Sequence, residues 1–267
     1  MDEYQEIIYQ VTAGSDRQIR FYNAQSGVPI ALELPPALAQ ARVTSIARAV
    51  GVGNRFGLGT DDGRLIPLTI EFISRFDEGT RHILPTLILG SPVQLTPSKE
   101  EIIRLAYQPT EQGTLAAALT NGGRLWYSST PSTVAPVALT GHGTEPVTAM
   151  IFDSRGETLS IGTAGGNLYH YEVREGTKPS LMETQSVAPT GTSVTALSYL
   201  IGDRSLAIGT SAGDVSVWMP VRQAQESSTT RLRLIHQFDA HPSPVTVISP
   251  SLRDKGFITG DTQGNLF

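Results

Sequence analysis

The pentapeptide Gly209-Thr-Ser-Ala-Gly213 has the G-x-S-x-G pattern that carries a nucleophilic serine in many hydrolases. The pattern does this chemistry only at a sharp turn from a strand into a helix, and no helical periodicity follows it in this chain. The same slot holds Gly-Thr-Ala-Gly-Gly at 162–166 and Gly-Thr-Asp-Asp-Gly at 59–63. We therefore interpret Ser211 as part of a recurring turn and not as a nucleophile.

Three residues near the C-terminus have a spacing that a metal ion could use, namely His236, Asp239 and His241. The alternative is that Asp239 and His241 lie in a loop that enters a strand, where the histidine makes a structural hydrogen bond. We favour this alternative and predict no metal site. Each other histidine is isolated and is interpreted as a surface group or a satisfied hydrogen-bonding partner. These are His82, His142 and His170.

Two pairs of carboxylates, Asp61-Asp62 and Glu100-Glu101, could be imagined as a general acid and base. Both pairs are adjacent in sequence, one on a predicted turn and one at a predicted strand start, so solvated charge explains them. The chain has no GxxxxGK loop to hold nucleotide phosphates. We predict no catalytic residue, no cofactor and no enzymatic activity.

Composition narrows the class of protein further. The chain has 267 residues, of which 39% are hydrophobic and 17% charged, and this is typical of a globular protein. The formal charge is −5 and the Lys and Arg residues are scattered, so the sequence shows no basic patch of the kind that binds nucleic acid. The absence of cysteine excludes disulfides and cysteine zinc sites. No apolar run is long enough to span a bilayer, and the start MDEYQEII lacks the layout of a signal peptide.

The glycine-bearing turn belongs to a phrase that occurs six times in the chain. Apolar and polar residues alternate after the turn, as in GNLYHYEV from Gly166, so the period is two and predicts strands. The spacing between copies lies mostly in the forties, which is the range of a four-stranded propeller blade. The copies begin at Gly14, Gly59, Leu119, Gly162, Gly209 and Gly260.

Each phrase has similar neighbours. A short β-branched segment lies about fifteen residues upstream, as in VTAMIF from Val147, and IIRLAYQP from Ile102 is a looser copy. The unit is strand, turn, strand, tight turn, strand, and then a variable outer strand. A single twisted sheet of this kind cannot bury its own faces, but a ring of them can. The sequence predicts an all-β protein, a single β-propeller domain of about six four-stranded blades, or seven with truncation at both ends. The repeats are approximately 1–40, 41–100, 101–144, 145–191, 192–242 and an incomplete 243–267.

We assign the repeated glycines an architectural role, because glycine permits positive φ in a tight turn and a close approach of two backbones. Trp218 belongs to the same structural set. The glycines are Gly14, Gly59, Gly63, Gly123, Gly162, Gly166, Gly209, Gly213, Gly260 and Gly264.

The phrase GTSAGDVSVWMP resembles the strand–turn–strand signature of the WD-repeat β-propeller family, with Trp218 at the family's Trp position. His142, in GHGTEPVTAM, and His241, in DAHPSPVTVI, resemble the Gly-His that opens its repeats. Met219 replaces the Asp that follows Trp in the family. The resemblance implies a divergent propeller in which the family's buried His–Asp–Ser–Trp network is incomplete in every blade. The other Trp positions are taken by Tyr22, Tyr171 and Ser128.

A narrower resemblance covers most of the chain. Two segments are similar to the soluble propeller-like segment of certain bacterial phosphate-type ABC transporter permease subunits. They are SVWMPVRQAQ from Ser216 and LIHQFDAHPSPVTVISPSLRDKGFITGDTQGNL from Leu234. The resemblance implies a periplasmic, non-catalytic module whose partners are other transporter subunits, with the membrane reached only through flanking segments. The alternative is a free-standing WD-repeat-like interaction scaffold in the cytoplasm.

The ends of the chain fit a piece of a longer polypeptide. In the later repeats the β-branched segment starts fifteen or sixteen residues before the phrase, which would place the first one at or before residue 1. The last copy stops at Phe267, where the fourth copy continues as LYHYEV.

Two regions interrupt the repeat. The longer is an insertion at 71–101, and the other is a polar run at 221–230. Excursions from a rigid ring are where propellers commonly place partner contacts, although a tolerated surface loop is the plain alternative. The candidate contact residues are Arg75, Phe76, Asp77, Arg81 and His82.

Overall fold

The computed structural model is almost entirely β-structure. Its one helix among the described residues, α1 (Pro36–Ala39), is short, and no helix there is long and apolar enough to cross a membrane. The residues described are 9–13, 19–23, 27–29, 35–39, 41–77, 80–111, 113–130, 135–174, 176–222, 230–251 and 253–267.

Within the described residues, the strands form six antiparallel sheets, numbered here 1 to 6, and the main strands of each pair in chain order. Sheet 1 contains β1 (Tyr9–Ala13) and β2 (Ile19–Asn23). Sheet 2 contains β3 (Val43–Arg48), β4 (Arg55–Thr60), β5 (Arg64–Asp77) and β6 (Thr80–Leu89), with β7 (Val93–Gln94) also on β5. Sheet 3 contains β8 (Ile102–Pro109), β9 (Thr114–Thr120), β10 (Leu125–Thr130) and β11 (Val137–Ala138).

The second half of the chain repeats this meander. Sheet 4 contains β12 (Val147–Phe152), β13 (Thr158–Thr163), β14 (Asn167–Glu172) and β15 (Ser180–Ser186). Sheet 5 contains β16 (Val194–Tyr199), β17 (Leu206–Thr210), β18 (Val215–Arg222) and β19 (Thr230–Gln237). Sheet 6 contains β20 (Val245–Pro250) and β21 (Phe257–Asp261).

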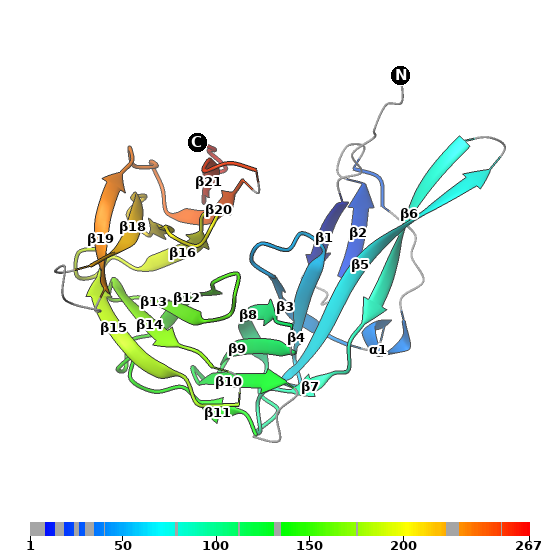
Figure 1. Cartoon of the computed structure of the whole chain (residues 1–267), viewed down its shortest axis with the longest axis horizontal. Helices are drawn as coiled ribbons and strands as arrows, with labels where there is room; N and C mark the ends of the chain where they lie inside the picture. The colour runs from blue at the N-terminus through cyan, green and yellow to red at the C-terminus, as the bar shows by residue number, and fades with distance from the viewer. Residues whose placement is uncertain are drawn as a thin grey trace.

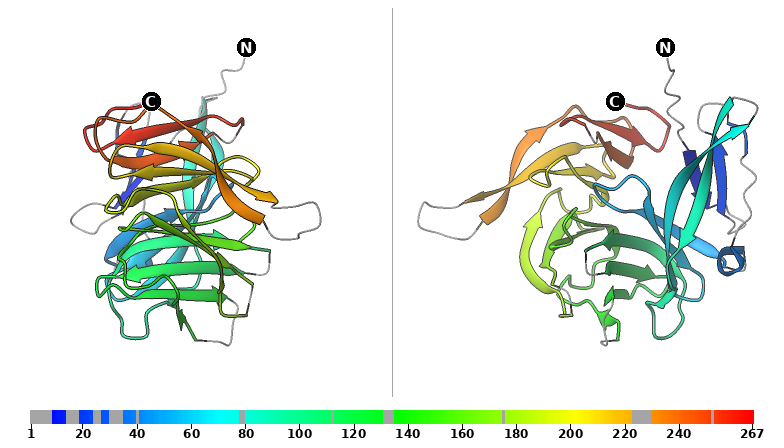
Figure 2. Two further views of the ribbon diagram at one scale, coloured as in Figure 1. Left: turned by 90° about the vertical axis from the view of Figure 1, so that its left-hand side faces the viewer. Right: turned by 45° about the vertical axis from the view of Figure 1, so that its right-hand side comes forward.

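The sheets stand around a common axis (Figure 1), with the inner strands β3, β8, β12, β16 and β20 toward the centre. Figures 1 and 2 show an arc that is open between sheet 6 and sheet 1. This arrangement confirms the predicted all-β propeller with about six blades. Sheets 1 and 6 have two strands each among the described residues, and residues 265–267 turn back to pair with β21 through a bridge between Gly260 and Leu266.

The core lies between neighbouring sheets. One cluster joins Leu115 and Tyr127 of sheet 3 to Leu159 of sheet 4, and another joins Ala207 of sheet 5 to Val245 of sheet 6. A blade is therefore covered on both faces, and successive residues of its middle strands are buried even though their side chains alternate.

A recurring hydrogen bond closes the tight turn between the second and third strands of a blade. The hydroxyl of Thr60 accepts from the Arg64 N–H at 2.9 Å, and the hydroxyl of Thr210 accepts from the Asp214 N–H at 3.2 Å. In sheet 6 the carboxylate of Asp261 takes this role. The glycine just before the third strand has positive φ, the left-handed region that other residues avoid. These glycines are Gly63, Gly123, Gly166, Gly213 and Gly264.

The joint between two sheets has its own pattern. A Cβ added to Gly162 of β13 would lie 2.4 Å from Cγ1 of Val194, the first residue of the next inner strand, so only glycine fits. Beside it, the Thr148 hydroxyl donates to the Val194 carbonyl at 2.6 Å. Thr44 makes the equivalent bond to the Ile102 carbonyl at 2.7 Å. The VT dipeptide at the start of an inner strand thus joins blades.

The joint between sheets 3 and 4 departs from this pattern. Arg104 pairs with Leu119 where sheet 4 pairs Ala149 with Gly162, so large side chains replace a small residue and a glycine. Ile103 also stands at the threonine position and cannot donate a hydroxyl. This joint therefore lacks both the close-packed glycine and the threonine bond found between sheets 2 and 3 and between sheets 4 and 5.

Removing a joint-forming hydroxyl is expected to cost stability only where it has a partner. We expect Thr148→Val to lower the free energy of unfolding by about 1 kcal/mol, because a hydrogen bond between sheets is lost. Thr195 holds the same position in β16, but its Oγ1 is buried without a partner among the described residues. Thr195→Val should therefore change stability by less than about 0.5 kcal/mol. Urea denaturation of both variants tests this, and equal losses would contradict the role given to Thr148.

The insertion at 71–101 is not a loop over most of its length. β5 and β6 continue past the edge of sheet 2 as a long hairpin that projects from the ring (Figure 1). Its register places Arg75 opposite His82 and Phe76 opposite Arg81. The β-branched and aromatic residues of this stretch favour longer strands. The spacing between repeats shows only that the stretch is long, and does not distinguish longer strands from a loop. Phe76 is exposed, and the other four candidate contact side chains lie outside the described ones. In the second interruption, residues 223–229 also lie outside the described part.

Candidate functional site at the mouth of the central channel

The inner strands border a central channel, and one mouth of it forms a cavity of about 470 Å³. The ends of β3, β12, β16 and β20 supply its walls, together with the loops that follow them. Because four different sheets contribute, the cavity exists only when the blades are assembled. It is therefore a feature of the ring and not of any one repeat.

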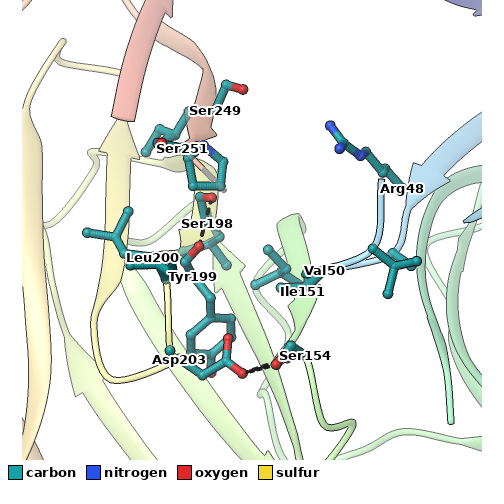
Figure 3. A pocket seen from close by; sticks show the side chains of 18 of the residues that line it. Arg48, Val50, Ile151, Ser154, Ser198, Tyr199, Leu200, Asp203, Ser249 and Ser251 are labelled. Atoms are coloured by element: carbon teal, nitrogen blue, oxygen red, sulfur yellow. Dashed lines mark hydrogen bonds between the residues drawn. The ribbon is translucent and has the colours of Figure 1, made fainter. Parts of the chain in front are cut away.

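A chain of hydrogen bonds between loops fixes the shape of this mouth. Gln108, which is 1% exposed, accepts from the Val50 N–H at 2.9 Å and donates to the Ser154 carbonyl at 2.8 Å. Ser154 in turn donates its N–H to the Asp203 carboxylate at 3.0 Å, and its hydroxyl donates to the same oxygen (Figure 3). These contacts tie sheets 2, 3, 4 and 5 together.

Asp203 lies in a turn whose backbone is in the left-handed region, with φ of 54°. Aspartate tolerates this region better than most residues, and the two bonds from Ser154 hold its carboxylate in place. Nearby, burial raises the pKa of Asp153, and the carboxylates of Asp203 and Glu157 add to the effect. The rim is thus built from preorganised polar groups.

The cavity also presents hydrogen-bond donors. Arg48 extends from the end of β3 into the opening, across from Ser249 and Ser251 of sheet 6 (Figure 3). The one carboxylate among the lining residues, Asp203, accepts both hydrogen bonds from Ser154. A guanidinium and several hydroxyls in one opening suit the binding of a polar or anionic group.

A second polar network lies between sheets 4 and 5. The Ser160 hydroxyl is 2.9 Å from His170 Nδ1 and 2.8 Å from the Tyr199 hydroxyl. Burial lowers the pKa of His170 to about 4, so its ring is neutral near pH 7. Burial also raises the pKa of Tyr199, mainly by removing water from the phenol. His170 is therefore a bonded core residue, although its Nε2 has no partner among the described residues.

The groups that resemble a WD-repeat network are divided between two sheets. Trp218 Nε1 donates to the Ser216 hydroxyl at 2.9 Å in sheet 5. In sheet 6, His241 Nε2 is 2.7 Å from the Thr259 hydroxyl, and its Nδ1 is 3.5 Å from the Asp261 carboxylate. Neither sheet joins all four residue types through these contacts.

Three of the residues first considered for chemistry have structural partners. The Ser211 hydroxyl accepts from the Ser193 N–H at 2.9 Å, in a tight turn without a following helix. Asp62 pairs with Arg64 at 2.7 Å, and Glu100 pairs with Arg124 at 3.2 Å. Within the described ranges, no three His, Cys, Asp or Glu side chains gather as metal ligands would.

The predicted structural glycines lie at the turns and joints, apart from Gly14, which is outside the described residues. Sequence reasoning missed Gln108, Ser154 and Asp203, because the glycine-bearing phrase that marks the repeats contains none of them. It also missed Arg104, although IIRLAYQP departs visibly from the VT pattern and could have drawn attention to it.

Comparison with known proteins bears on the fold alone. No family model and no curated protein matches the sequence. Among solved structures, the β-propeller domain of Cps50 (Swd1) from Myceliophteria thermophila matches with a TM-score of 0.61, covering 97% of this chain and 81% of that one. The fold is a β-propeller. Sequence identity to that propeller is 13%, so the likeness extends to architecture and not to activity.

Proposed function

We propose that this propeller is a non-catalytic interaction module and that its β5–β6 hairpin contacts a partner protein. The observation that carries the proposal is the projecting hairpin itself, whose Phe72, Ile73 and Phe76 are all exposed. Phe76 is 74% exposed, close to the hairpin tip. Aromatic side chains are enriched at protein interfaces, and paired strands present them with little loss of conformational entropy on binding.

At a finer level, we propose that the partner is another subunit of a phosphate-type ABC importer, met on the extracytoplasmic side of the membrane. The support is the sequence resemblance of the segments from Ser216 and Leu234 to permease components. The rival function is a free-standing scaffold in the cytoplasm. Membrane-spanning helices encoded on both sides of this segment in its reading frame would favour the importer, and none on either side would exclude it.

The hairpin contact can be tested by substitution of its most exposed aromatic residue. We expect Phe76→Ser to weaken binding to the importer subunits at least about tenfold, since a buried aromatic anchor commonly contributes 2 kcal/mol or more at an interface. Titration of the full-length protein with each subunit encoded beside it measures the effect.

A matched control is Met182→Ser, because Met182 is also largely exposed, at 57%, but lies on β15. It should leave the affinity unchanged, and both variants should keep the melting temperature of the parent. Equal affinities of the parent and Phe76→Ser would overturn the assignment of the hairpin.

A further inference from the structure

The second end of the central channel is a cavity of about 400 Å³ between the inner strands. It shares Leu197, Val247 and Ile248 with the mouth cavity, so the two are parts of one channel. Its lining has hydroxyl groups from three inner strands and contains no aspartate or glutamate. Arg104 is the one charged residue among the lining residues.

Arg104 has no hydrogen bond or ion pair within the described part of the chain. It reaches solvent inside the channel, where the surrounding protein removes enough water to lower the pKa of its guanidinium. Arginine remains protonated despite such a shift, so the cavity holds a positive charge without a counter-charge. A partly desolvated cation with no partner is costly, and a bound anion would offset that cost.

Two hydroxyls in the same lining are also unpartnered. Ser45 Oγ and Thr195 Oγ1 are both buried without a hydrogen-bond partner among the described residues. Buried polar groups in native proteins nearly always have a partner. In β12 the hydroxyl equivalent to Thr195, that of Thr148, does have one. Two free hydroxyl donors and a free guanidinium therefore border one cavity.

We propose that this cavity binds a small oxyanion, namely a phosphate, sulfate or carboxylate group, through the Arg104 guanidinium and the Ser45 and Thr195 hydroxyls. The planar guanidinium can donate two parallel N–H bonds to such a group, and hydroxyls can satisfy its remaining oxygens. The opposite mouth carries one positive and one negative side chain, Arg48 and Asp203, so the unpaired positive charge of the channel is that of Arg104. The proposal does not depend on the identity of a protein partner.

Calorimetric titration with inorganic phosphate at low ionic strength tests the site. We expect saturable binding to the parent, a loss of at least about tenfold in affinity for Arg104→Gln, and a smaller loss for Thr195→Val. Arg155→Gln is the control, because Arg155 lies outside the channel and pairs with Glu157. Absence of binding, or an equal loss in Arg104→Gln and Arg155→Gln, would overturn the proposal.

The source of the oxyanion is decided by a second titration with an acetylated glutamate peptide. Tighter binding of the peptide indicates a carboxylate of a protein partner, and tighter binding of phosphate indicates a free ion. Circular dichroism without phosphate checks that each variant is folded. If Arg104→Gln does not fold, Arg104→Lys and Thr195→Val carry the test, and unchanged affinity in both would refute the site.

Discussion

Replacing Gly213 with alanine is expected to lower the free energy of unfolding by about 3 kcal/mol or more. Gly213 has a φ of 92°, which strains any side-chain-bearing residue. A Cβ at this position would also lie 2.2 Å from the carbonyl oxygen of His241, so the loop that enters sheet 6 would have to move. That movement would disturb the contact between His241 and Thr259. Urea denaturation monitored by tryptophan fluorescence and circular dichroism measures the loss.

Gly264 offers a control at the same position of the next turn. Its φ of 83° is similar, but an added Cβ would meet no atom within 4 Å. Gly264→Ala should therefore carry the backbone strain alone, about 1 kcal/mol. If the two variants were equally destabilised, the close approach to His241 would contribute nothing and the explanation for Gly213 would be wrong.

Acidification from pH 7 to pH 5 should remove about 2 kcal/mol of stability through His170 alone. Burial lowers its pKa from the ordinary 6.5 to about 4 in the folded protein. Below pH 6.5 the unfolded chain binds a proton that the folded chain does not, so stability falls with pH until the folded histidine also titrates near pH 4. The effect is large because the ring is held among Ser160 and Tyr199 without solvent.

The measurement is the free energy of unfolding as a function of pH for the parent and for His170→Gln. The variant should lose less stability between pH 7 and pH 5 than the parent, by about 2 kcal/mol, whatever its stability at pH 7. His236→Gln serves as the control, because His236 is exposed. Parallel pH profiles of the parent and His170→Gln would show that burial does not hold this ring neutral.

The propeller could be predicted because sheets 2 to 5 repeat the same local requirements. A glycine with positive φ and a threonine that closes the turn recur at a fixed spacing, as at Thr60 with Gly63 and at Thr210 with Gly213. Such signals act over a few residues and are visible in one sequence. The long hairpin of β5 and β6 could not be predicted in this way, because the extra length in that repeat was interpreted as an insertion and not as longer strands.

The channel could not be predicted in this way. Gln108, Ser154 and Asp203 meet only because successive blades bring their loops to one face, and none of the three is distinctive by type. Arg104 is a candidate because no acidic side chain pairs with it among the described residues, and this can be seen only once the inner strands are assembled. Local pattern therefore defined the blades, whereas the candidate site depends on contacts between residues far apart in sequence.

The unusual joint between sheets 3 and 4 should make the arc less stiff at that point than at the joints of Thr44 and Thr148. At the joints of Thr44 and Thr148 a glycine and a threonine hold one blade against the next, but Leu119 and Ile103 replace them at this seam. Bending of the ring would concentrate there, with Gln108 as a tether across it. Arg104 borders the same seam. An anion that bridged Arg104 to the neighbouring inner strands would therefore stiffen this joint. Occupancy of the channel would then be coupled to the shape of the whole arc.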